Sequence, residues 1–352
     1  MANDISDVTV NITVEDVVNP AAFGGMCLFI PSETDVELPY TEVYSYDEAK
    51  STIEGAELTS SGTTMEKMAQ IAFMQDPCPE KIGLLSCPID NLSNYLNCDF
   101  RYLIPITSDI EDIKSISAYI ESCGAYKVVC VDLTSGSTGT DMVKYSDYKT
   151  NMATFKGYER TLFYVGVPAV DGVNSICTAL IAKTCSKAVG SFVYKNMTLK
   201  GVYADESITK AQLDEYHDNN VNAYVHKAGY DATSEGKLAN GSYIDILDAK
   251  DWLITQIKYR LQQILIINDK IEYDDNGIGL LESGVVDVLK TGYENKMIAQ
   301  SEDGGAAYTV NFARRSETKA SDREKRQYVE GKFSFNLAGG IHTVTVNGTI
   351  NI

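Results

Sequence analysis

Apolar and polar residues alternate at the start of the chain. In "DISDVTVNITV", residues 4–14, one face of an extended chain carries Val8, Val10, Ile12 and Val14, and the other face is polar. This alternation predicts a strand, which ends at the proline- and glycine-rich break "NPAAFGG".

The last residues, "GGIHTVTVNGTINI", show the same alternation. Every second position is apolar or glycine, at Val344, Val346, Gly348, Ile350 and Ile352. We expect residues 341–346 to fold back as a hairpin on the preceding run "KFSFNLA". No turn follows Thr349 in the sequence, and an exposed strand edge readily pairs with another chain.

The middle of the chain mixes two periodicities. Short apolar runs predict strands at "MCLFIP", "KIGLLSC", "RYLIPI", "YKVVCVDL" and "TLFYVGV". Amphipathic runs predict helices at "TTMEKMAQIAFMQ", "DIEDIKSISAYIESCG", "GVNSICTALIAKTCSK" and "SITKAQLDEYHDNN", with caps expected at Thr63 or Thr64 and at Ser207. Strands that alternate with helices indicate an α/β layer structure.

A polar, glycine-rich hinge, "GYDATSEGKLANGSY", precedes a different pattern. The longest predicted helix, "DAKDWLITQIKYRLQQILI", has Asp248 or Asp251 near its start and apolar residues at helical spacing. A second helix, "GLLESGVVDVLKTGYENKMI", and strands at "AYTVNFA" and "GKFSFNLA" follow. The length of 352 residues is typical of roughly two domains.

Composition excludes several classes of protein. A net charge of −19 argues against nucleic-acid binding. No run approaches the roughly 18 apolar residues of a membrane span. The first residues, "MANDISDVTV", show no signal-peptide pattern, so we expect the protein to fold in a cytoplasm. The eight cysteines form no C-x-x-C, and His217, His226 and His342 lack metal-ligand spacing, which indicates buried free thiols.

One stretch resembles a catalytic motif. "LTSGSTGTD", residues 133–141, follows an apolar run and resembles the Ser/Thr/Gly phosphate loop of adenylate-forming enzymes. That family continues with Pro, Lys and Gly, whereas "DMVKYS" follows here, so a surface loop of turn-forming residues is the simpler interpretation. No G-x-S-x-G and no P-loop motif occurs. A nucleotide-binding enzyme is therefore the alternative function, and it rests on this loop alone.

A basic segment stands out from the acidic chain. "FARRSETKASDREKRQYVEGK" holds seven basic residues against four acidic ones, and four of the seven arginines of the chain. Ser321 is a candidate cap of a short helix that begins at "DREKR". The segment fits either a solvated loop with local salt bridges or a patch for an acidic partner.

The C-terminal third of the chain resembles the contractile tail sheath proteins of phages, R-type bacteriocins and defective prophage particles. The resemblance is clearest in "DWLITQIKYRLQQILI", "IEYDDNGIGLLESGVVDVLKTGYENKMI" and "KASDREKRQYVEGKFSFNLAGGIHTVTVNGTI". It extends to "DVTVNITV" and "NPAAFGG", whereas residues 27–228 match only in general α/β character.

This resemblance implies a structural protein without catalysis, cofactor or metal. It implies an α/β (α+β) chain of two domains, an inner core domain from residues 1–22 plus 238–352 and an outer α/β domain inserted at 23–237. Such subunits stack as six-fold rings around an inner tube and contract to drive the tube through a cell envelope. The implied partners are further copies, the tube protein, and baseplate and sheath-terminating proteins, with no nucleic acid and no membrane insertion. Assembly is expected in the bacterial cytoplasm, before a phage tail or bacteriocin particle is released.

Two sets of site residues follow from the resemblance. Strand arms that pair with neighbouring subunits correspond to Val8, Val10, Ile12, Val14, Val344, Val346, Thr349, Ile350 and Ile352. A tube-facing basic patch corresponds to Arg314, Arg315, Lys319, Arg323, Lys325 and Arg326. A tube or capsid component is a third possible function, but tube proteins of this kind are smaller and mostly β.

Overall fold

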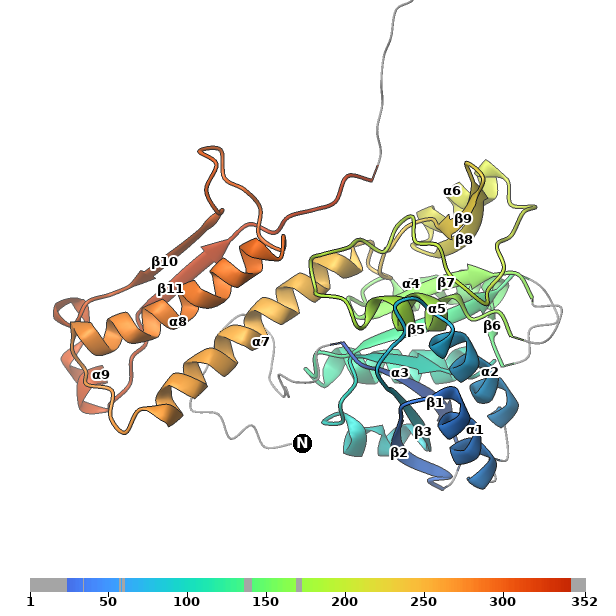
Figure 1. Cartoon of the computed structure of the whole chain (residues 1–352), viewed down its shortest axis with the longest axis horizontal. Coiled ribbons are helices and arrows are strands. Elements are labelled where there is room, and N and C mark those ends of the chain that lie inside the picture. The colour runs from blue at the N-terminus through green and yellow to red at the C-terminus, as the bar shows by residue number, and fades with distance from the viewer. Residues whose placement is uncertain are drawn as a thin grey trace, which may run out of the picture.

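A computed structural model describes residues 24–33, 35–56, 58, 61–135, 141–168 and 173–342. The predicted strand arms, Val8 to Val14 and Val344 to Ile352, lie outside the described residues. Figure 1 shows a large module that surrounds a sheet and a small module of two helices and a hairpin, joined by the long helix α7, Ile244–Ile267. We use "large module" for residues 24–247 and "small module" for residues 252–338.

The large module is built on a nine-stranded sheet. The strands follow the order β2-β3-β1-β4-β5-β7-β8-β9, and β6 also pairs with β5. Among the strands described, only β2 and β9 run antiparallel to their neighbours. The strands are β1 Met26–Pro31, β2 Leu38–Val43, β3 Ile82–Cys87, β4 Tyr102–Pro105, β5 Val128–Thr134, β6 Val143–Lys144, β7 Thr161–Gly166, β8 Asn222–Lys227 and β9 Tyr230–Thr233.

Helices cover both faces of this sheet, which explains its uniformly apolar strands. Leu28 belongs to a core with helices α1, α2 and α5, whereas Phe29 belongs to a second core with α3, α4 and α6. The helices are α1 Tyr46–Gly55, α2 Gly62–Phe73, α3 Ile110–Ser122, α4 Tyr145–Phe155, α5 Ile176–Thr184 and α6 Lys210–Asp218. A short 3-10 helix, Ile89–Tyr95, precedes β4.

The five predicted strands and the four predicted helices of this module are confirmed. The helices α1 and α4 and the strands β2, β6, β8 and β9 were not predicted. The predicted polar hinge contains β9, which forms a hairpin with β8.

The predicted helix caps are wrong in detail. The hydroxyl of Thr64 donates to Asp141 Oδ2 at 2.6 Å instead of capping α2. Helix α6 is capped by Thr209 rather than by Ser207, because Gln212 completes a capping box with Thr209.

The small module has its own core. Helix α8, Asp275–Glu294, packs antiparallel to α7 and against the hairpin of β10, Tyr308–Phe312, and β11, Gly331–Phe335 (Figure 1). A 3-10 turn, Arg315–Glu317, and the short helix α9, Ala320–Glu324, lie in the loop between the two strands. The core contains Leu253, Ile257, Ile278, Val285, Val288, Leu289, Ile298 and Phe312.

Helix α7 belongs to both modules. Its first residues, Ile244 and Leu247, are buried in a core of the large module together with Leu238, whereas Leu253 and Ile257 are buried in the core of the small module. None of the helices in the described ranges is long and apolar enough to span a membrane.

The expected hairpin of residues 341–346 on β11 is wrong for its described part. Strand β11 pairs with β10, and Ile341 is 85% exposed. Beyond Ala338, whose N–H donates to the carbonyl of Met297 at 2.8 Å, the chain leaves the small module. Residues 341 and 342 therefore do not pair with β11 as a further strand.

Two glycines near the start of α8 provide a test of the close backbone packing where the chain enters this helix. A Cβ on Gly277 would lie 2.0 Å from the carbonyl oxygen of Glu272, whereas a Cβ on Gly279 would meet only Arg314 Nη1, at 3.9 Å. We expect Gly277→Ala to lower the free energy of unfolding by about 1–3 kcal/mol because the backbone must shift. Gly279→Ala should raise it by about 0.5–1 kcal/mol because alanine restricts the unfolded chain. Urea unfolding of both variants measures the difference, and equal effects would contradict the described entry.

Candidate functional site

Three basic residues stand directly before three adjacent strands of the large sheet. Arg101 precedes β4, Lys127 precedes β5 and Arg160 precedes β7. These strands are parallel, so the three residues lie together at the N-terminal ends of the strands, which we call the sheet edge. All three are buried. A buried cation needs a counter-charge or several hydrogen-bond acceptors.

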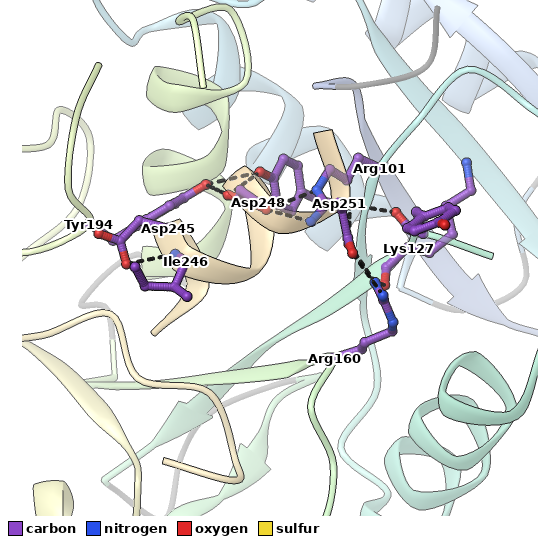
Figure 2. Close-up of polar contacts among 10 residues, drawn as sticks. Arg101, Lys127, Arg160, Tyr194, Asp245, Ile246, Asp248 and Asp251 are labelled. Atoms are coloured by element: carbon purple, nitrogen blue, oxygen red, sulfur yellow. Dashed lines mark hydrogen bonds and ion pairs between the residues drawn. The ribbon is translucent and has the colours of Figure 1, made fainter. Parts of the chain in front are cut away.

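Helix α7 supplies the counter-charges. Asp248 and Asp251 are three residues apart, so they share one face of the helix. The sequence placed these two residues near the start of the helix. They lie one turn or more inside it, because α7 begins at Ile244. Asp248 and Asp251 are 2% and 0% exposed, and they face the sheet edge (Figure 2).

Asp251 bridges the two arginines. Its carboxylate accepts from Arg160 Nη1 at 2.8 Å and Nη2 at 3.1 Å, and its Oδ2 lies 3.0 Å from Arg101 Nη1. Arg101 also donates from Nε and Nη2 to Asp248 Oδ1, at 2.9 and 2.6 Å. Burial alone would lower the pKa of Arg101, but the charges of Asp248 and Asp251 raise it above its ordinary value.

Two tyrosines complete this cluster. The hydroxyls of Tyr102 and Tyr194 donate to Asp248 Oδ2 at 2.9 and 2.8 Å and lie 2.9 Å from each other. Burial, and then the charge of Asp248, raises the pKa of both tyrosines well above its usual value. We call Arg101, Tyr102, Arg160, Tyr194, Asp248 and Asp251 the junction cluster. It holds two positive and two negative charges, and each charge has a partner.

Lys127 lies beside the junction cluster and is satisfied differently. Its amine donates to the carbonyl oxygens of Cys98, at 3.0 Å, and Phe100, and it lies 4.1 Å from the centre of the Phe100 ring. Burial lowers the pKa of Lys127 to about 8. Its own carbonyl accepts from Arg160 Nη1 at 3.5 Å. The amine therefore braces the chain before β4.

The structure divides the predicted basic patch into two groups. Arg314 pairs with Glu282 at 3.1 Å, and Arg323 Nη1 donates to the carbonyls of Arg315, at 3.2 Å, and Thr318. These two side chains hold the loop together. The other four are exposed and have no side-chain partner among the described residues; they are Arg315, Lys319, Lys325 and Arg326. The predicted short helix exists, but it begins at Ala320, and Ser321 lies inside it.

Exposed apolar residues lie at the same end of the small module as this loop. Ile266 and Ile267, the last residues of α7, are 72% and 67% exposed. The connection from α7 to α8 contacts the loop, because the Tyr273 hydroxyl donates to the carbonyl of Gln327 at 3.1 Å. This end of the molecule thus combines exposed basic side chains with exposed apolar residues.

The described residues bring no other candidate chemistry from the sequence together in one place. Residues 136–140 of the "TSGSTGT" loop lie outside the described residues, and the Ser135 hydroxyl donates to the carbonyl of Gly166 at 3.3 Å. No group of three or more His, Cys, Asp or Glu side chains within the described ranges is placed to hold a metal ion. Cys27, Cys87, Cys130 and Cys177 are buried as predicted, whereas Cys78 is exposed.

Comparisons with known proteins define the class of fold. No protein-family profile and no curated protein sequence matches the chain. The contracted helical sheath of the anti-feeding prophage matches with a TM-score of 0.68 and 13% identity, over 98% of this chain and 100% of that one. The contracted sheath complex of the PVC extracellular contractile injection system matches with 0.70 and 12%, over 98% and 99%. The sheath tail protein of Desulfitobacterium hafniense matches with 0.54 and 9%, over 86% and 93%.

The chain therefore has the fold of contractile sheath proteins. The α/β class predicted from the sequence is confirmed, with a nine-stranded mixed sheet and a separate two-stranded hairpin. At these identities the similarity establishes the fold, and the function is argued separately below.

The junction cluster provides a test of how α7 is held. Asp251→Asn should lower the free energy of unfolding by about 3–5 kcal/mol, because Arg160 loses its carboxylate partner in a buried site. Asp214→Asn, which breaks the exposed pair with Lys210 on α6, should cost less than about 1 kcal/mol. Urea unfolding of the full chain measures both values. A cost for Asp251→Asn no larger than that for Asp214→Asn would rule out a stabilising role for the cluster.

Proposed function

We propose that the protein is the structural subunit of a contractile sheath. It polymerises as stacked hexameric rings around an inner tube and contracts to drive that tube through a cell envelope. The observation that carries this proposal is the match to contracted sheaths over 98% of the chain. The partners are then further copies, the tube protein, and baseplate and terminating proteins, and the protein ends in a released particle. The role is mechanical rather than enzymatic, which fits a junction cluster whose charges are all paired.

The domain division is part of this proposal. We assign both ends of the chain to an inner domain and the segment between them to an inserted outer domain, for which the sequence suggested the bounds 1–22 plus 238–352 and 23–237. The separate cores of the large and small modules support two domains. The burial of Leu238 and Leu247 in the large module favours a boundary within α7 rather than at residue 237.

The hairpin of the small module is the proposed acceptor of strand arms. In the part of the chain that the structure describes, β10 and β11 pair only with each other. An isolated two-stranded sheet is marginally stable and leaves unpaired backbone groups along both outer edges. Arms that contain Val8 to Val14 and Val344 to Ile352 of neighbouring subunits would pair with these edges. Main-chain hydrogen bonds of this kind link subunits while the modules keep their shape.

Truncation tests the arms. Deletion of residues 1–14, or of residues 345–352, should leave a folded monomer that no longer polymerises, because the buried residues of the described cores all lie between Met26 and Phe312. Circular dichroism checks folding, and sedimentation velocity with negative-stain microscopy checks for rings or cylinders. Deletion of residues 1–3 alone is the matched control and should leave polymerisation intact. Normal cylinders from either truncated chain would contradict the arm assignment.

The basic loop is the proposed contact with an acidic tube. Arg315, Lys319, Lys325 and Arg326 supply exposed charge, and Ile266 and Ile267 supply adjacent apolar surface. Contacts between exposed charges are screened by salt and are individually weak, so they can release on contraction. Arg314 and Arg323 contribute by shaping the loop.

Charge reversal tests this contact. Lys325→Glu with Arg326→Glu should reduce tube-templated assembly by about tenfold or more, because oppositely charged patches govern encounter and register. Lys144→Glu with Lys156→Glu, at two exposed positions of the large module, changes the net charge equally and is the control. Co-sedimentation with the tube protein of the same particle measures assembly. Tube-filled sheaths in normal yield from the first variant would refute the tube-facing assignment.

A further inference from the structure

The chain returns to the large module after β11. Leu337 still bridges Ile298 in the small module, but Gly340 and His342 contact the large module. Figure 1 shows this segment running from the hairpin toward the large module. Together with α7, it is a second connection between the modules, and it leads directly into the C-terminal arm.

His342 is held by two residues of the large module. Its Nδ1 lies 2.8 Å from Glu235 Oε2, and its ring meets that of Tyr243 edge-on, with 4.7 Å between centroids. The side chains of His342 and Glu235 are 17% and 12% exposed. The second oxygen of Glu235 pairs with Lys195, so the carboxylate has a second partner that holds it in place.

Gly340 allows the backbone to approach closely. A Cβ at this position would lie 2.6 Å from Cγ1 of Val193, a distance that requires one of the two to move. The φ angle of Gly340 is not in the left-handed region, so an alanine there is strained only by Val193. The close contact and the His342 contact lie two residues apart and hold the same short segment.

We propose that Gly340 and His342 pin the root of the C-terminal arm to the large module. They are positioning residues, and the inference rests on the proposed function of the arm. The arm beyond the pin, residues 343–352, can reach at most about 35 Å, so fixing its origin limits where it can bind. A fixed origin raises the effective concentration of the arm near its acceptor. It also couples the neighbour that the arm holds to the large module rather than to the small hairpin.

A double-mutant cycle tests the pin in the full chain. Gly340→Ala should raise the critical concentration for polymerisation about tenfold, because the clash with Val193 releases the root. Val193→Ala alone should have little effect, and the double variant should return to within about twofold of the wild type, because it removes the clashing methyl. His342→Ala should act like Gly340→Ala, whereas His342→Asn keeps a donor near the Nδ1 position and should retain most of the wild-type behaviour. The midpoint of thermal unfolding should stay unchanged throughout, which separates positioning from general stability.

A monomer measurement keeps the pin and the proposed function distinguishable. The chain has three histidines, so the imidazole NMR signals of His217 and His226 are internal references. Gly340→Ala should shift the His342 signal toward that of an exposed histidine, and Val193→Ala in the same chain should reverse the shift. A wild-type chain that never polymerises would overturn the proposed sheath function, and the NMR result alone would then decide the pin. An unchanged His342 signal, polymerisation of Gly340→Ala at the wild-type concentration, or no rescue by Val193→Ala would overturn the pin.

Discussion

The contact of Asp251 with Arg101 and Arg160 is the constraint on which the arrangement of this protein depends. Three buried charges stay stable only while they remain together, because an ion left alone in such a site costs several kcal/mol. Asp251 lies on the helix that both modules share, and the arginines lie at the edge of the sheet. Any shift of α7 along the sheet would separate these charges, so the cluster fixes the register of the helix.

Because the first turns of α7 are fixed in the large module, the helix carries any movement of that module to its other end. The 24 residues of α7 extend over roughly 36 Å, from the core of the large module to the end of the small module near the basic loop. A displacement of the large module is therefore transmitted to the surface that carries Arg315 and Lys325. The large module, α7 and the small module would then move as one piece.

Four of the seven arginines lie in the basic loop and two in the junction cluster, and they differ in burial and in their partners. Arg101 and Arg160 are buried and paired, Arg314 and Arg323 shape the loop, and the guanidinium groups of Arg315 and Arg326 are exposed. Composition alone cannot separate these roles, because burial and pairing decide whether a cation stabilises the chain or meets a partner. A signal was present in hindsight: a basic residue directly precedes each of the apolar runs of β4, β5 and β7.

The sequence by itself determined the strongly periodic elements, namely the apolar strands of the large sheet, the long helix α7 and the hairpin strands, because their side-chain spacing reports which face is buried. It missed α1, α4, β2 and β8, and it missed β6 and β9, whose 2 and 4 residues are too few to show a period. Only the tertiary structure decided that Asp251 meets Arg160, 91 residues away, and that His342 meets Glu235, 107 residues away. Such partners are set by the order of the strands and the path of the chain between modules, which local periodicity does not encode.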